Sequence, residues 1–235
     1  MNDKIYLFDF DGVLVDSMPY WSEKMINILR ITNTDYPDDI IKIITPLGDR
    51  GTAEYFRDVL KVELTIEQMY ALMDTFALPK YRDVIGLKDG VYEYLQQLKE
   101  NNCSINILTA SPHKMVDPCL KRLGIFDWFD NVWTCEDLNM PKSDVRIYGE
   151  AAERLNCRTS DIVFFDDNIV ALQTASQAGL YTTGVYDKTS EDLIQKVTDV
   201  SNQYIYSFNE FKSLKNNKKA ETKRQEKTTK RSINT

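Results

Sequence analysis

Short, mostly apolar runs alternate with segments of helical periodicity along most of the chain. The runs that we expect to form buried strands are residues 4–10, 104–108, 161–165 and 181–185. Between them, apolar residues recur at spacings of three and four, as in Val91, Tyr94, Leu95 and Leu98, which is typical of amphipathic helices. Strands that alternate with helices of this length indicate βαβ units, so we expect an α/β protein with a Rossmann-like parallel sheet.

The segment 16–86 follows a different pattern. It is rich in helical spacing, contains no run typical of a buried strand, and is interrupted by four prolines. We therefore expect an all-helical cap inserted after the first strand, with the α/β core resuming near Leu87. The predicted domains are a core formed by residues 1–15 and 87–212, a helical cap at 16–86 and a tail at 213–235.

Charge separates this tail from the rest of the chain. The last 23 of the 235 residues hold eight Lys or Arg against two Glu, a net charge of +6, whereas the other residues carry 21 basic and 34 acidic side chains, a net charge of −13. A segment with almost no apolar residues cannot repay its ordering entropy, so we expect the tail to be disordered. The acidic body argues against nucleic acid as the main ligand, except through the tail.

Composition narrows the class of protein further. With 43% hydrophobic residues and no apolar run of about 18 residues, the chain is typical of a globular protein without a membrane span. Asp3, Asp9 and Asp11 exclude a secretion signal at the N-terminus, so we expect a cytoplasmic protein. Four cysteines without a CxxC pair and a single histidine, His113, disfavour a zinc site and a histidine-dependent hydrolase. A protein of this size is expected to work as a monomer or weak dimer.

Three of the predicted strands end in carboxylate or hydroxyl side chains. These side chains are Asp9, Asp11, Thr109, Ser111, Asp166 and Asp167. In an open parallel sheet the carboxyl ends of the strands form one ligand-binding edge, so we expect these groups to converge there. Carboxylates gathered in a dry site need a cation, and a set of oxygen ligands favours Mg²⁺, which also accepts phosphate oxygens. The pattern therefore predicts a site for a phosphorylated small molecule.

The spacing of Asp9 and Asp11 suits two chemical roles. Two residues apart on an extended strand, their side chains would face the same side, about 7 Å from each other. One carboxylate could attack phosphorus while the other protonates the leaving oxygen. Lys142 precedes a predicted helix at 146–155 and could neutralise charge on the transferring group.

Residues 9–17, DFDGVLVDS, resemble the first motif of the haloacid dehalogenase-like superfamily. Thr109-Ala110-Ser111 resembles its second motif, Lys142 its third and Asp166-Asp167 its fourth, although the prolines that usually follow the lysine of the third motif are absent from Lys142-Ser143-Asp144. Within the superfamily, the chain is similar to the β-phosphoglucomutase and phosphoglycolate phosphatase-like group, over roughly residues 4–212.

The resemblance implies roles for the acidic residues. Asp9 would be the nucleophile that forms an aspartyl-phosphate, and it would also bind Mg²⁺. Asp11 would be the general acid and then the general base, with its main-chain carbonyl on the metal. Asp166 and Asp167 would complete the metal site.

The resemblance also implies a phosphate-binding set. Thr109 and the main-chain amides of Ala110 and Ser111 would hold phosphate oxygens, and Lys142 would pair with the phosphoryl group and with the nucleophile. Arg50 lies roughly where the mutases carry a segment that binds sugar phosphate, but the sequence around Arg50 matches that segment poorly.

Three functions stay open at this point. The first is a Mg²⁺-dependent phosphatase acting on a small phosphorylated metabolite, which the poor match at Arg50 favours. The second is a hexose-phosphate mutase similar to β-phosphoglucomutase, in which a sugar hydroxyl takes the place of water. The third is a phospho-accepting signalling module, which we disfavour because the predicted strand at 131–134 is followed by Cys135 and Glu136 rather than by an acceptor aspartate.

Overall fold

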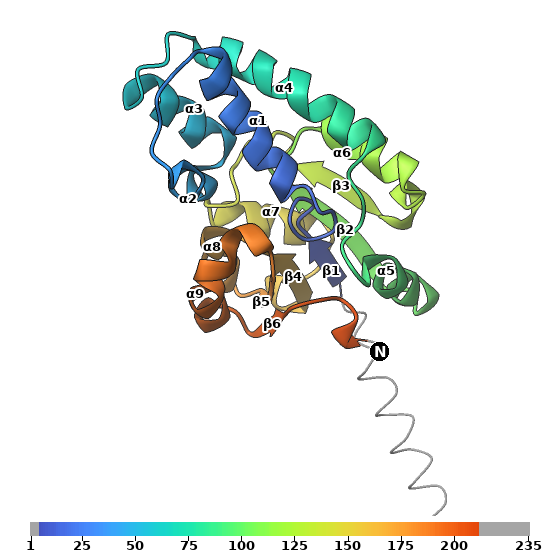
Figure 1. The fold of residues 1–235 in the computed structure, drawn as a ribbon. Coiled ribbons are helices and arrows are strands. Elements are labelled where there is room, and N and C mark those ends of the chain that lie inside the picture. The colour runs from blue at the N-terminus through green and yellow to red at the C-terminus, as the bar shows by residue number, and fades with distance from the viewer. Residues whose placement is uncertain (1–4, 212–235) are drawn as a thin grey trace, which may run out of the picture.

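The computed structural model describes residues 5–211, which form a six-stranded sheet flanked by helices (Figure 1). The strands lie in the order β3-β2-β1-β4-β5-β6, and every neighbouring pair is parallel. Their bounds are β1 (Ile5–Phe8), β2 (Ser104–Thr109), β3 (Asn131–Thr134), β4 (Ile162–Asp166), β5 (Tyr181–Val185) and β6 (Gln203–Ile205). The expected α/β fold with a parallel sheet is confirmed.

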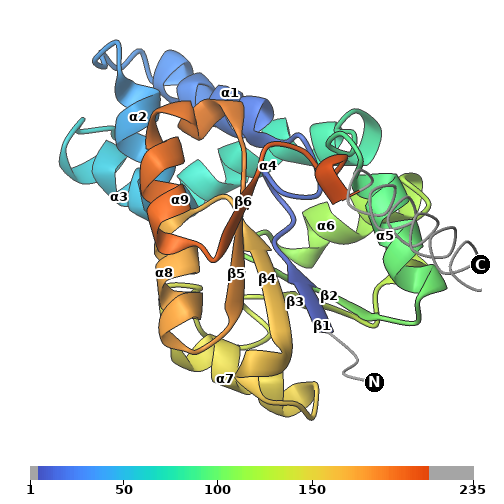
Figure 2. The same ribbon diagram turned by 90° about the horizontal axis from the view of Figure 1, so that it is seen from below.

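Helices cover both faces of this sheet (Figure 2). The helices that flank the sheet are α5 (Val91–Glu100), α6 (His113–Arg122), α7 (Arg146–Arg154), α8 (Ile169–Gln177) and α9 (Ile194–Val200). One buried cluster unites α5 and α6 with the sheet around Phe8 and Phe165, whose ring centroids lie 4.6 Å apart. A second cluster unites α7 and α8 with the opposite face around Tyr148 and Phe164. Apolar side chains on both faces explain why the strands read as nearly continuous apolar runs.

Four helices lie between β1 and α5 in the sequence and stand together over one end of the sheet (Figure 1). They are α1 (Met18–Ile31), α2 (Ile40–Ile44), α3 (Gly48–Asp58) and α4 (Ile66–Asp83). Buried residues such as Met25, Phe56 and Met69 give them a hydrophobic cluster of their own. The expected helical insertion after the first strand is thus confirmed, while the domain limits at 15/16 and 86/87 stay a prediction. The tail predicted at 213–235 lies outside the described residues.

Short 3-10 turns connect several of these elements, at Thr45–Leu47, Phe126–Trp128, Thr159–Asp161 and Lys188–Leu193. Among residues 5–211, no helix combines the length and the apolar character needed to cross a membrane.

The first strand is shorter than the sequence indicates. It ends at Phe8 because the chain turns immediately afterwards, and the Phe10 carbonyl accepts hydrogen bonds from the amides of Leu14 and Val15. The amide of Asp9 still donates to the Phe165 carbonyl at 2.8 Å, so Asp9 remains anchored to the sheet. Asp11 therefore lies in a tight loop and not on an extended strand.

Candidate active site

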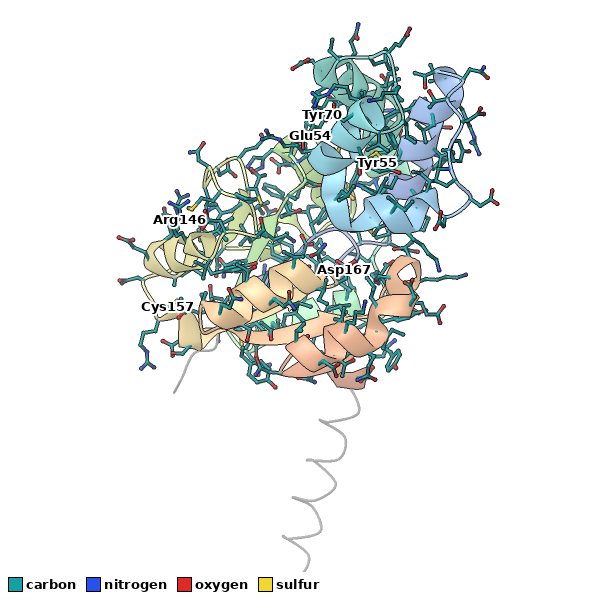
Figure 3. The ribbon with its side chains drawn as sticks, turned by 90° about the vertical axis from the view of Figure 1, so that its left-hand side faces the viewer. Glu54, Tyr55, Tyr70, Arg146, Cys157 and Asp167 are labelled. Carbon is teal, nitrogen blue, oxygen red and sulfur yellow. The ribbon has the colours of Figure 1, made fainter. Side chains whose placement is uncertain are left out.

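The carboxyl ends of three adjacent strands bring the predicted site residues together. Asp9 follows β1 directly, while Thr109 and Asp166 are the last residues of β2 and β4, the two neighbours of β1 in the sheet. Figure 3 shows Asp167, next along the chain, on the side of the core that faces the cap helices. The site is thus formed at the sheet edge beneath the cap.

Three of these carboxylates form a compact cluster. One oxygen from each of Asp9, Asp166 and Asp167 lies within 4.8 Å of the others, and the first two residues are only 6% and 0% exposed. The Lys142 ammonium lies 2.6 Å from Asp9 Oδ2 and 2.7 Å from Asp166 Oδ2. Three carboxylates against one ammonium leave a net charge of minus two when all are ionised. Buried oxygen ligands with that charge fit a divalent cation such as Mg²⁺.

The pKa values of the cluster reflect this uncompensated charge. Burial, together with the charge of Asp166, raises the pKa of Asp9 to about 7 even though Lys142 opposes the shift. Burial and the charges of Asp166 and Asp9 raise the pKa of Asp167 well above its usual range. Burial alone would lower the pKa of Lys142, but its two carboxylate partners raise it well above its usual range, so this side chain stays protonated. A bound cation would favour the ionised carboxylates.

A glycine lets Asp167 approach the cluster. Gly12 has a φ of +70°, and a Cβ at this position would lie 2.6 Å from Asp167 Oδ2. The carbonyl of Gly12 accepts a hydrogen bond from Lys88 Nζ at 2.6 Å, and the same ammonium lies 2.9 Å from Asp187 Oδ2. Sequence reasoning missed Lys88 and Asp187. The strand-end argument would have found Asp187, which follows β5 by two residues.

Asp11 is held apart from the carboxylate cluster. Its Oδ1 accepts a hydrogen bond of 2.6 Å from the Tyr81 hydroxyl, and its Oδ2 accepts one of 2.5 Å from the Ser111 hydroxyl. Burial and the charge of Asp11 raise the pKa of Tyr81 well above its usual range, so the phenol keeps its proton. No sequence signal pointed to Tyr81, which lies 70 residues from Asp11.

The loop after β2 differs in one detail from the sequence-based expectation. A Ser-Pro pair such as Ser111-Pro112 is typical of an N-cap followed by proline at the first helical position, but here Pro112 occupies the N-cap and the helix begins at His113. The Ser111 hydroxyl is free for Asp11 as a result, while its amide donates to Thr109 Oγ1 at 3.1 Å. Thr109 is buried and Ala110 is exposed. The phosphate-binding role of this loop stays a prediction.

The cap contributes a second charged network. Asp49 accepts hydrogen bonds from Trp21 Nε1 at 2.6 Å and from Lys24 Nζ at 2.7 Å, and Lys24 is only 4% exposed. The neighbouring Arg50 has 83% of its side chain exposed, and its Nε donates to Glu54 at 3.1 Å. A contact between Arg50 and substrate stays a prediction.

The fold and the site together define an α/β protein with a cluster of carboxylates that could hold a cation, at the sheet edge under a helical cap. The family model described as haloacid dehalogenase-like hydrolase matches residues 4–179, and the chain belongs to that family. The resemblance inferred from the motifs is confirmed.

Several characterised or solved proteins are similar to this chain. The validoxylamine A 7'-phosphate phosphatase of Streptomyces hygroscopicus subsp. limoneus is 25% identical over 185 residues, which cover 77% of this chain and 85% of that protein. The pyrophosphatase PpaX of Bacillus velezensis is 28% identical over 185 residues, covering 76% of this chain and 81% of that protein.

Solved structures share the fold at lower identity. A predicted phosphoglycolate phosphatase from Haemophilus somnus 129pt superposes with a TM-score of 0.75 at 18% identity, covering 92% of this chain and 99% of that chain. A β-phosphoglucomutase from Clostridium difficile superposes with a TM-score of 0.72 at 17% identity, covering 91% of this chain and 96% of that chain. These likenesses show the fold of the group expected from the sequence.

Proposed function

We propose that this protein is a Mg²⁺-dependent phosphatase that hydrolyses a small phosphorylated metabolite through an aspartyl-phosphate on Asp9. The observation that carries the proposal is the cluster of Asp9, Asp166 and Asp167 at the carboxyl edge of the sheet, in which Asp9 and Asp166 both contact the Lys142 ammonium. Family membership and the names of the relatives support a phosphoester hydrolase. A cytoplasmic location and a monomeric or weakly dimeric state belong to the proposal as well.

The first half-reaction uses Asp9 and Asp11. A carboxylate oxygen of Asp9 attacks phosphorus, and the bond between phosphorus and the leaving oxygen breaks while Asp11 donates a proton to that oxygen. Lys142 stabilises the negative charge of the transferring phosphoryl group, since its ammonium already lies 2.6 Å from Asp9. Asp9, Asp166 and Asp167, together with the main-chain carbonyl of Asp11, would hold Mg²⁺, which would supply further neutralisation of charge on the phosphoryl oxygens.

The second half-reaction returns Asp9 to its free form. Asp11, now ionised, takes a proton from water, and the oxygen of that water attacks phosphorus. The bond between Asp9 and phosphorus breaks, and inorganic phosphate leaves. Thr109 at the end of β2, with Ala110 and Ser111 in the loop that follows it, would hold the phosphate oxygens during both steps.

Water is the preferred acceptor over a sugar hydroxyl. A mutase must also bind the second phosphate of a sugar bisphosphate, and that requires cations on the cap. The cap side chains Lys24 and Arg50 are each paired with a carboxylate, Asp49 and Glu54. Incubation with β-glucose 1-phosphate separates the two reactions, because a phosphatase releases inorganic phosphate and a mutase forms glucose 6-phosphate.

A screen of phosphorylated metabolites tests the proposal. Release of inorganic phosphate is measured with Mg²⁺ and again with EDTA, for the unaltered protein and for Asp9→Asn and Asp11→Asn. We expect turnover that requires Mg²⁺ and falls by about 10³-fold or more in both variants, with little change in thermal unfolding. Unchanged turnover in either variant, or turnover indifferent to EDTA, would contradict the mechanism.

A further inference from the structure

The side chain that holds Asp11 comes from the cap segment. Tyr81 lies in the last turn of α4, two residues before the helix ends at Asp83, and its hydroxyl donates to Asp11 Oδ1 at 2.6 Å. The Ser111 hydroxyl reaches the other oxygen, Oδ2, at 2.5 Å from the loop after β2. The carboxyl group is thus held between two hydroxyls that come from different parts of the chain.

Tyr81 is itself firmly placed. Only 4% of Tyr81 is exposed. Its ring stacks on that of Phe10, with 6.2 Å between the ring centroids and 23° between the ring planes. Arg122 of α6 donates to the Tyr81 carbonyl at 3.2 Å and also to the Ile85 carbonyl, which ties the end of α4 to the core. A hydroxyl fixed by packing and by the backbone restricts the rotation of its partner.

From this geometry we infer that Tyr81 is the positioning residue for Asp11 and holds its carboxyl group in the orientation needed to protonate the leaving oxygen. The inference rests on the proposed function, in which Asp11 is the general acid. Proton transfer needs the donor within hydrogen-bond reach of the leaving oxygen, and small displacements of a catalytic group are costly. An aspartate side chain that could rotate freely would spend part of its time in unproductive orientations.

A tyrosine hydroxyl suits both halves of the reaction. A hydroxyl can donate to an ionised carboxylate and can accept from a protonated carboxyl group. Tyr81 can therefore stay bonded to Asp11 before and after the proton has moved. Phenylalanine at this position would keep the ring packing on Phe10 and remove the hydroxyl, with its hydrogen bond to Asp11 and its interaction with the Ser111 side chain.

The dependence of rate on the leaving group tests the inference. A series of substituted phenyl phosphates, from 4-nitrophenyl phosphate to phenyl phosphate, runs from leaving groups that need little protonation to leaving groups that need more. We expect Tyr81→Phe to lower kcat/KM for phenyl phosphate about 10-fold more than for 4-nitrophenyl phosphate. Tyr94→Phe is the matched control, because it removes a hydroxyl from a buried tyrosine of α5, and we expect it to leave the ratio unchanged.

Two further variants keep the test decisive. In an Asp11→Asn background, Tyr81→Phe should no longer change the ratio between the two substrates, because the group that it positions is absent. Ser111→Ala, which removes the hydroxyl on the other oxygen and keeps its amide, should change the ratio in the same direction as Tyr81→Phe. If Tyr81→Phe does not fold, Ser111→Ala still tests whether the hydroxyl contacts of the Asp11 carboxyl group determine the ratio between the two substrates.

The outcomes separate the inference from the function on which it rests. An equal fall for all leaving groups in Tyr81→Phe, or no fall, would overturn the positioning role. An unaltered protein that releases no phosphate from any ester with Mg²⁺ would instead overturn the proposed function.

Discussion

At the scale of single residues, Gly12 determines how closely Asp167 can approach the other two carboxylates. Its φ of +70° lies in the left-handed region, where a residue with a Cβ is strained, and the Cβ would overlap Asp167 Oδ2 at 2.6 Å. Its carbonyl also accepts from the Lys88 ammonium. One residue without a side chain therefore shapes the carboxylate cluster.

Gly12→Ala should weaken Mg²⁺ binding. The added methyl group displaces Asp167, so we expect the Mg²⁺ concentration for half-maximal phosphate release to rise about 10-fold or more, with a loss of about 1–3 kcal/mol in the free energy of unfolding. Mg²⁺ titrations followed by phosphate release and by calorimetry measure both effects. Gly149→Ala is the control, because a Cβ on this α7 residue meets nothing within 4 Å and should leave Mg²⁺ binding unchanged. Equal Mg²⁺ affinity in Gly12→Ala and the unaltered protein would contradict the role of Gly12.

At the scale of elements, α4 connects the cap to the active site. Its first turn is closed by a capping box, in which the Thr65 hydroxyl accepts from the Gln68 amide and the Gln68 side chain accepts from the Thr65 amide. Its last turn carries Tyr81, whose hydroxyl contacts Asp11. The same helix thus begins at a local sequence signal and ends at a tertiary contact.

Thr65→Ala should destabilise the start of α4. It leaves the Gln68 amide without its partner, and we expect the free energy of unfolding to fall by about 1 kcal/mol. Urea unfolding followed by circular dichroism measures the change. Thr75→Ala in the exposed middle of the same helix is the matched control, because alanine is the better helix former there, and it should be neutral or slightly stabilising. A similar loss in both variants would argue against the capping contribution.

The sequence predicted the elements that have a clear hydrophobic period. It did not predict the limits or existence of strands that depend on contacts with other parts of the chain. The runs at 104–108 and 181–185 became β2 and β5 almost unchanged. The strand β6 was missed because its three residues, Gln203–Ile205, are too short for a period and depend on pairing with β5. β1 was predicted two residues too long because its apolar pattern continues through Phe10, which is buried within the turn.

At the scale of the whole molecule, the buried carboxylates should link stability to pH and to the proposed binding of Mg²⁺. Asp9 has a pKa raised to about 7, against 3.8 for an ordinary aspartate, so between these values the folded protein binds more protons than the unfolded protein. The free energy of unfolding must then fall as pH rises through this range, and most of the fall is complete above the folded pKa. A cation that favours the ionised carboxylates removes this loss.

The thermal midpoint without metal should therefore be lower at pH 8 than at pH 5. In EDTA we expect a decrease across this range, and we expect the stabilisation by Mg²⁺ to grow as pH rises. His113 adds a metal-independent loss in the same direction, because its hydrogen bond to Asp117 raises its pKa and is weakened when the ring deprotonates. Asp9→Asn should reduce the pH dependence in EDTA. Mg²⁺ stabilisation of equal size at both pH values would contradict the link.

The sequence by itself determined the fold class, the family and the identity of the clustered carboxylates, because hydrophobic periods and strand-end motifs are local features of the chain. Asp9 and Asp166 could be placed at one sheet edge from these features and the geometry of parallel strands alone. Only the tertiary structure decided which side chains surround each carboxylate. The contact of Tyr81 with Asp11 joins residues 70 positions apart through the docking of α4 on the core, and no local pattern encodes such a contact.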